Sequence, residues 1–252
     1  MTKARIGGTV DLSTIDWYGR ITSMTFFAGC NFRCPYCQNA SLIPLESGKE
    51  LDTDDIVERL RRNLGIVDAA GFTGGEPCLQ AEALKELARK AKALGLKVFL
   101  NTNGSNPQVI SDMIQDGLLD YVALDVKARL DPEPYGRAIG QGELGEAAVR
   151  NVKATMEKCL KAGITLEART TIVPGLVDQE EEIREVSNEI ARAHLYVLQQ
   201  FSPEGDILDQ NFKNVTPPSR ETLARLARVA LECGAREVRI RTKERGEETI
   251  QP

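Results

Sequence analysis

The 252-residue sequence predicts an α/β fold in which parallel strands form a closed or partly closed barrel. Short apolar runs recur along the chain, each of a length that suits one buried strand. Amphipathic stretches with helical spacing separate the runs, and the joins are short. This alternation favours a parallel sheet, because parallel neighbours need a crossover between them.

Seven apolar runs are expected to form strands, and polar residues lie at the ends of several of them. The predicted strands are Ile21–Phe27, Ile66–Gly74, Lys97–Thr102, Tyr121–Val126, Thr165–Val173, Leu195–Phe201 and Glu237–Arg241. The carboxyl ends of barrel strands carry the functional residues, so these polar residues are expected to share one face.

Four helices are predicted from apolar residues spaced three and four apart. The first runs from about Leu79 to Leu94 and is expected to end at Gly95, a typical helix C-cap. The others lie around Val149–Leu160, Ile183–Ile190, which follows the acidic segment DQEEE, and Leu223–Leu231.

The least regular stretch, Ala128–Gly145, is predicted to be a long loop after the fourth strand. Loops of this length in compact domains are usually functional or mobile. No repeat, low-complexity tract or Pro/Ser-rich linker divides the chain. Residues 1–252 are therefore expected to form a single domain.

Composition excludes several classes of protein. Apolar residues make up 42% and charged residues 27%, as in ordinary globular proteins, and the net charge of −5 argues against a nucleic-acid surface. The amino-terminal segment lacks the apolar core of a signal peptide, and no apolar run is long enough to span a membrane. A cytoplasmic location is expected, where clustered cysteines indicate metal binding or catalysis.

The single histidine, His194, is predicted to be a hydrogen-bonded strand residue. Sites that require two histidines, such as zinc hydrolase and facial-triad iron sites, are excluded.

Three of the six cysteines lie within FAGCNFRCPYCQNA, at Cys30, Cys34 and Cys37. A zinc site would need a fourth ligand, and no second CxxC pair exists. A thioredoxin-like pair would leave Cys30 unexplained. A [4Fe–4S] cluster held by three thiolates keeps one iron open to another ligand. Cys159 and Cys233 lie on apolar helix faces and are expected to be buried free thiols.

The spacing C-x3-C-x2-C, with Tyr36 before the last cysteine, resembles the signature of the radical S-adenosylmethionine (SAM) superfamily. Further motifs strengthen this resemblance: TGGEP at 73–77, NTNG at 101–104, LDVK at 124–127 and RTTIVPG at 169–175. Together they resemble the glycyl-radical-enzyme activating proteins over essentially the whole chain. The segment Ile6–Asn39 is most similar to the activating proteins of anaerobic ribonucleoside-triphosphate reductase.

The resemblance implies a partial (β/α)6-type parallel barrel, a [4Fe–4S] cluster and SAM. It assigns the cluster to Cys30, Cys34 and Cys37, and it gives Asp16, near the substrate, and Arg169, on a strand, catalytic roles. The residues that it implies for cofactor binding are Tyr36, Asn39, Gly74, Gly75, Glu76, Thr102, Asn103, Asp125 and Lys127. The Glu76 carboxylate is expected to meet the amino acid ammonium of SAM.

Three positions depart from the family pattern. Gln38 stands where many relatives have histidine, Phe201 replaces a histidine that contacts the ribose, and Asn101 replaces an aspartate associated with a monovalent cation. The ribose contact and any cation are therefore left open.

The resemblance implies reductive cleavage of SAM, after which a 5′-deoxyadenosyl radical takes a hydrogen atom from a glycine of a partner enzyme. The implied partners are a glycyl radical enzyme and a flavodoxin- or ferredoxin-like electron donor, with neither nucleic acid nor membrane. Asp16 and the Ala128–Gly145 loop are expected to border the partner's entrance. The alternatives are an activator of the pyruvate formate-lyase type, a small-molecule or cofactor-maturation radical enzyme, an iron–sulfur electron carrier, and a non-catalytic regulatory module.

Overall fold

One ten-stranded sheet forms the centre of the molecule, which the computed structural model describes for residues 2–251. Seven neighbouring strands run parallel and correspond to the seven predicted runs, so the α/β prediction is confirmed. They are β2 (Thr22–Phe27), β4 (Ala69–Gly74), β5 (Lys97–Thr102), β6 (Tyr121–Asp125), β7 (Thr165–Ile172), β8 (Leu195–Gln200) and β9 (Val238–Thr242).

Antiparallel strands that the sequence analysis did not predict extend the sheet at both ends. β1 (Lys3–Ser13) pairs with β2 and with β3 (Lys49–Asp52), and β10 (Gly246–Ile250) pairs with β9. Within residues 2–251, β3 and β10 are the two ends of the strand order and have no ladder between them. The barrel is therefore partial, as expected.

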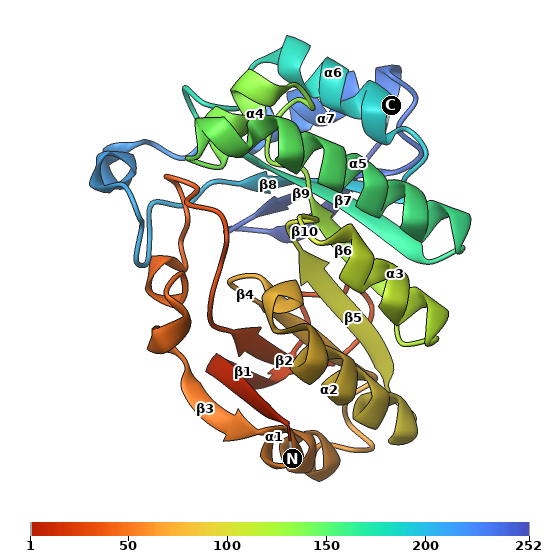
Figure 1. The fold of residues 1–252 in the computed structure, drawn as a ribbon. Helices are drawn as coiled ribbons and strands as arrows, with labels where there is room; N and C mark the ends of the chain where they lie inside the picture. Colours follow the sequence, from red (N-terminus) through yellow and green to blue (C-terminus); the bar gives the residue numbers. More distant parts are fainter. Residues whose placement is uncertain (1, 252) are drawn as a thin grey trace.

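In the described part of the chain, seven α-helices connect the strands and cover the outer side of the sheet (Figure 1). They are α1 (Thr53–Arg62), α2 (Ala81–Ala93), α3 (Pro107–Gln115), α4 (Pro132–Ala138), α5 (Gly145–Lys161), α6 (Glu180–Ile190) and α7 (Arg220–Glu232). Short 3-10 helices are η1 (Ala40–Leu42), η2 (Leu45–Ser47), η3 (Pro77–Gln80), η4 (Gly142–Leu144) and η5 (Gln210–Asn214).

The predicted helices form because their apolar residues share one face. In α2, Leu84 and Leu87 are fully buried, and the helix gives way to Gly95 at φ +80°, a conformation that favours glycine. The acidic start of α6 also contributes, because Gln179 and Glu182 form a reciprocal capping box.

Two apolar cores lie on the two faces of the sheet. The larger one fills the space between the sheet and its helices. A smaller one, made of Met24, Phe99, Tyr121 and Ala123, lies on the inner face, where Trp17 from the β1–β2 turn packs against it. The turn thereby closes one part of the barrel interior.

The prediction of a long loop over Ala128–Gly145 is wrong. The segment contains α4 and η4, and its Tyr135 and Ile139 are fully buried. Alternating Pro and Gly hid the short helix, because a proline at the first helical position is favourable rather than disruptive.

Two smaller predictions also need correction. Cys233 is half-buried at the C-cap of α7 rather than buried on its apolar face, whereas Cys159 is buried as expected. His194 is exposed and precedes β8 instead of lying in it, although its Nδ1 accepts a hydrogen bond from the Leu166 N–H at 3.1 Å.

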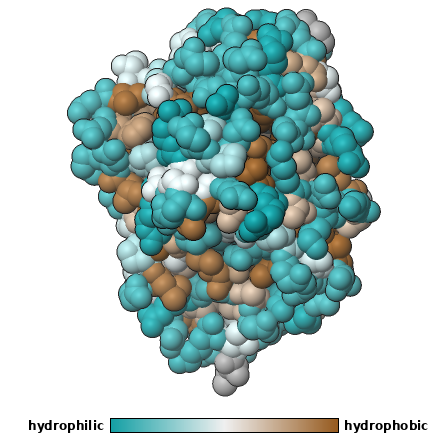
Figure 2. Space-filling view, turned by 45° about the horizontal axis from the view of Figure 1, so that its top comes forward, coloured by the Kyte–Doolittle hydropathy of each residue, from teal (hydrophilic) through white to brown (hydrophobic). Residues whose placement is uncertain are grey.

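Within residues 2–251, no helix is long and apolar enough to cross a membrane. The face drawn in Figure 2 is mostly hydrophilic, with small and separated apolar patches. Scattered apolar side chains of this kind are normal on protein surfaces.

Candidate functional site

A cavity of about 920 Å³ opens at the carboxyl ends of the parallel strands. This volume lies near the upper end of the range for small-molecule sites, roughly 300–1,000 Å³. Most of the residues implied by the resemblance line it. They are Cys30, Cys34, Tyr36, Cys37, Asn39, Gly74, Gly75, Thr102, Asn103, Asp125 and Lys127.

The cysteine loop, Cys30–Cys37, leaves the end of β2 and is held by segments far away in the sequence. The Cys30 N–H donates to the Ile43 carbonyl at 3.0 Å, and the Leu208 N–H donates to the Cys37 carbonyl at 3.2 Å. The loops after β2 and after β8 accordingly lie side by side in Figure 1. Backbone contacts with two distant segments therefore help to hold both ends of the loop in place.

The segment predicted as a loop supports the cysteine loop from behind. The Arg33 N–H donates to the Ile139 carbonyl at 2.9 Å, and a Cβ at Gly140 would lie 2.1 Å from the Arg33 oxygen. None of the residues that line the cavity comes from Ala128–Gly145. The cavity lining therefore gives no support to the expectation that this segment borders the entrance.

The three thiols fit a cluster better than a single metal ion. All are free, and burial raises the pKa of Cys30 to about 11 and of Cys34 to about 12. In the described part of the chain no three acidic, His or Cys side chains converge as one ion would require. An iron–sulfur cluster takes each thiolate on a different iron, so its ligands need not converge. The iron charge would offset the unfavourable burial of thiolates.

The glycine turn, Gly74–Gly75, touches the base of the cysteine loop. A Cβ at Gly74, where φ is +118°, would lie 2.3 Å from the Phe27 oxygen, and one at Gly75 would lie 2.2 Å from the Gly29 oxygen. Any side chain here would push the turn away from the loop. The two glycines therefore allow the close approach of β4 to the cysteine loop.

Glu76 does not line the cavity, so the structure does not support the expected contact between its carboxylate and the ammonium of SAM. Its side chain is 0% exposed and accepts hydrogen bonds from the N–H groups of Asn103 (2.7 Å) and Cys78 (2.9 Å). The Thr102 hydroxyl donates to it as well, at 2.9 Å. Glu76 thus ties the glycine turn to the NTNG segment at the end of β5.

We expect Glu76→Gln to destabilise the protein, because the amide presents N–H donors to groups that are themselves donors. A buried donor left unsatisfied costs about 1–3 kcal/mol in unfolding free energy. SAM affinity should fall as well, because Thr102 and Asn103 line the cavity. Denaturant unfolding and equilibrium binding measure the two effects. An unchanged unfolding free energy would contradict this role.

Asp125 and Lys127 form an ion pair in the cavity wall, with Nζ and Oδ2 2.8 Å apart. Burial alone would lower the pKa of Lys127, but the Asp125 carboxylate outweighs it and raises the pKa well above its ordinary value. The Lys127 ammonium therefore stays charged at neutral pH. A zwitterionic amino acid could pair with each of the two residues.

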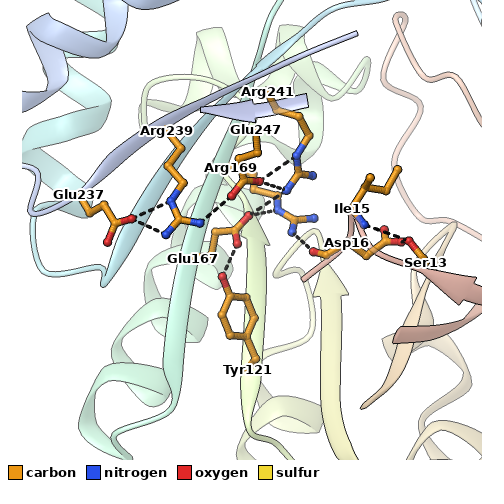
Figure 3. Close-up of polar contacts among 10 residues, drawn as sticks. All are labelled: Ser13, Ile15, Asp16, Tyr121, Glu167, Arg169, Glu237, Arg239, Arg241 and Glu247. Carbon is orange, nitrogen blue, oxygen red and sulfur yellow. Dashed lines mark hydrogen bonds and ion pairs between the residues drawn. The ribbon is translucent and has the colours of Figure 1, made fainter. Parts of the chain in front are cut away.

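Arg169 and Asp16 lie outside the cavity lining but in contact with each other (Figure 3). Arg169, 3% exposed, donates from Nη2 to the Asp16 backbone oxygen at 2.9 Å and pairs through Nε with Glu167. Glu167 outweighs the effect of burial and raises the pKa of Arg169. The Asp16 carboxylate accepts a hydrogen bond from the Ser13 hydroxyl at 2.5 Å.

The three departures from the family pattern all line the cavity. Gln38 donates to the Ser202 carbonyl at 2.7 Å, and Phe201 packs on Phe212. The Asn101 amide donates to Thr73 Oγ1 at 3.1 Å, and its oxygen is buried without a hydrogen-bond partner in the described residues. The Tyr36 hydroxyl is likewise buried without a hydrogen-bond partner in the described residues. Two unpaired polar atoms in the lining fit a site built for a polar ligand.

The sequence analysis missed a second group of lining residues. Thr14, Ile15 and Tyr18 come from the β1–β2 turn, and the remaining ones from β7–β10 include Thr171, Gln199, Arg241 and Glu247. The alternation in VRIRT, Val238–Thr242, could have indicated two arginines on one face of a strand.

Comparison with known proteins identifies the class. The family model of the Radical SAM superfamily matches residues 24–186. A protein of Methanocaldococcus jannaschii assigned as a glycyl-radical enzyme activating enzyme, MJ1227, is 37% identical over 90% of this chain and 92% of its own length. The pyruvate formate-lyase-activating enzyme of Clostridium pasteurianum is 30% identical over 75% of this chain and 76% of its own length. A radical SAM methyltransferase of Sphaerobacter thermophilus shares the fold, with a TM-score of 0.69 at 15% identity over 89% and 67% of the two chains.

The chain belongs to the radical SAM superfamily, and it is an enzyme whose cofactors are a [4Fe–4S] cluster and SAM. Within the superfamily, its relatives group it with the glycyl-radical-enzyme activating enzymes. This grouping disfavours the electron carrier and the non-catalytic module.

Proposed function

We propose that this chain forms a glycyl radical on a partner enzyme, and that the partner is anaerobic ribonucleoside-triphosphate reductase. The observation that carries the proposal is the shape of the cavity. Its lining runs from the three cysteines to the exposed turn residues Ile15 (71%) and Tyr18 (61%). Space for the cofactors is thereby continuous with a rim that a loop of another protein could reach.

Cys30, Cys34 and Cys37 would hold the cluster. Asp125 and Lys127 would bind the amino acid end of SAM, beside the Gly74–Gly75 turn. When bound, the cluster and SAM supply the organic radical that abstracts a hydrogen atom from glycine. The buried walls, Tyr36 among them, would exclude water from this radical.

Asp16 and Arg169 are the proposed substrate residues. Arg169 orders the turn through the Asp16 backbone oxygen. Among the described residues, the Asp16 carboxylate has a hydrogen bond from the Ser13 hydroxyl at the end of β1. A carboxylate so placed can accept hydrogen bonds from the N–H groups of an incoming chain.

The choice of reductase rests on the resemblance of Ile6–Asn39. An activator of the pyruvate formate-lyase type is the second candidate, because the relative from Clostridium pasteurianum carries that function in its name. The electron donor would be a flavodoxin- or ferredoxin-like protein, and six free cysteines suit the cytoplasm.

The test combines the anaerobically reconstituted, reduced protein with SAM and, in parallel, with each of the two glycyl radical enzymes. We expect an electron paramagnetic resonance (EPR) signal of a glycyl radical on the reductase. A signal on the lyase alone would transfer the proposal to the second candidate. SAM cleavage without a radical on either partner would favour a small-molecule substrate.

Asp16→Ala should lower the radical yield on the partner by about tenfold, because substrate positioning can carry factors of this size. SAM cleavage without partner should persist. Asp11→Ala is the matched control, since Asp11 is an exposed β1 residue that pairs with Arg59 at 3.1 Å. Equal radical yields in the two variants would make Asp16 a structural residue.

A further inference from the structure

The C-terminal hairpin β9–β10 forms a polar wall of the cavity. Thr171 on β7 lies in register with Gln199 on β8, Gln199 with Arg241 on β9, and Arg241 with Glu247 on β10. All four residues line the cavity. This row continues around the barrel from the cofactor side towards the β1–β2 turn.

Glu247 is the centre of this wall (Figure 3). Its side chain is 7% exposed and accepts hydrogen bonds from Arg239 Nη1 at 2.8 Å and Arg241 Nε at 3.1 Å. Burial would raise the pKa of Glu247, but the two guanidinium groups outweigh it and lower the pKa. One carboxylate therefore holds both arginines.

The first connection to the turn runs through Arg239. Its guanidinium carbon lies 4.5 Å from the centre of the Tyr18 ring, and Glu237 holds the same group from the other side at 2.7 Å. A guanidinium above an aromatic ring at this distance is a cation–π contact.

The second connection runs through the barrel interior. Arg241 Nη2 lies 4.0 Å from the Glu167 carboxylate, Glu167 pairs with Arg169, and Arg169 donates to the Asp16 backbone oxygen at 2.9 Å. Figure 3 shows this continuous path from the hairpin to the turn. Glu167 is 2% exposed, so water screens these contacts little.

Both connections end on the Thr14–Tyr18 turn, which has few apolar contacts of its own. Ile15 and Tyr18 are exposed, and Trp17 is the residue that packs into the inner core. The position of the cavity rim therefore depends strongly on charge contacts that start at Glu247.

We propose that Glu247 is a positioning residue for the protein substrate. It holds Arg239 and Arg241, and these two arginines fix the turn at the cavity rim where the substrate would bind. This inference rests on the proposed function for its substrate. It makes the C-terminal hairpin a determinant of partner binding rather than of cofactor binding.

The test compares Glu247→Gln with Glu248→Gln in the reconstituted enzyme. Glu248 is the next residue on the same strand but pairs with Arg220 of α7, at 2.9 Å from both Nε and Nη2, and does not line the cavity. We expect Glu247→Gln to raise the KM for the reductase about tenfold with little change in kcat, because the turn would lose contacts that hold it where the partner binds. Glu248→Gln should leave both constants unchanged. A KM that is equal in the two variants would overturn the proposal.

A second measurement needs no partner. Trp17 is the only tryptophan and lies in the turn, so its fluorescence reports the turn directly. Acrylamide should quench Trp17 more strongly in Glu247→Gln than in Glu248→Gln. Arg239→Gln, which removes only the first connection, should give an intermediate increase and replaces Glu247→Gln if that variant does not fold. If neither Glu247→Gln nor Arg239→Gln increases the quenching of Trp17 relative to Glu248→Gln, the proposal is overturned. If the wild type activates no glycyl radical enzyme, the proposed function fails, while the quenching result still decides whether the hairpin positions the turn.

Discussion

Replacing Cys34 with alanine should abolish the iron–sulfur cluster, with iron content falling from about four per chain to near zero after anaerobic reconstitution. Cys34 is buried in the middle of the cysteine loop, and backbone contacts at both ends of the loop fix its place. Among the described residues that line the cavity, no cysteine other than Cys30, Cys34 and Cys37 and no histidine could replace it. Cys30→Ala and Cys37→Ala should have the same effect.

Cys159→Ala is the matched control for this loss. Cys159 is fully buried in α5 and does not line the cavity, so the variant should retain the whole cluster. The small cavity left by the sulfur should cost about 1 kcal/mol of stability. Iron analysis and the visible absorption spectrum measure both variants. A complete cluster in Cys34→Ala would contradict the assignment of the three cysteines.

The parallel strands could be predicted because burial on both faces leaves an apolar run in the sequence. β5 matches its prediction from Lys97 to Thr102, and the other strands differ at their ends by a few residues. β1 escaped prediction because its residues Gly8 to Leu12 are half-buried or exposed. α1 also escaped, although Ile56, Val57 and Leu60 have helical spacing.

Local motifs predicted the part of the site that comes from single segments. The cysteine loop, the glycine turn and the pair formed by Asp125 and Lys127 all line one cavity. The depth of a side chain was not predictable, because it depends on contacts between strands far apart in sequence. Glu76 follows two glycines that line the cavity, yet its carboxylate points away from the cavity and accepts a hydrogen bond from the Asn103 N–H.

The contacts of Arg169 could not be predicted either, because its partner lies far away in the sequence. Its position on β7 indicated the inner face, but its partner at the Asp16 carbonyl lies 153 positions earlier in the chain. Glu247 was not expected at all, since β10 is a short polar strand, and Arg241 was expected only as the end of the strand Glu237–Arg241. Charged residues that face a barrel interior look like surface residues in a sequence.

Lys127→Ala should weaken SAM binding by about 2–5 kcal/mol, the cost of truncating one partner of a buried charge pair. Lys127 contributes in two ways. Its ammonium can pair with the carboxylate of SAM, and it neutralises Asp125, which would otherwise repel that carboxylate. Equilibrium binding gives the affinity, and the SAM-induced change in the EPR spectrum of the reduced cluster reports whether SAM still reaches the iron.

Lys153→Ala provides the comparison for lysine removal. Lys153 pairs with Glu189 at 2.9 Å on an exposed surface, where such a pair contributes roughly 0–1 kcal/mol to stability, and it lies outside the cavity. The variant should bind SAM like the wild type. Lys127→Met separates charge from volume, because it keeps an unbranched side chain of similar length. If Lys127→Met binds SAM normally, the ammonium makes no contact with the ligand, and the amino acid end of SAM must lie on another part of the wall. If both Lys127 variants lose affinity while the cluster stays complete, the pair formed by Asp125 and Lys127 binds SAM independently of the cysteines.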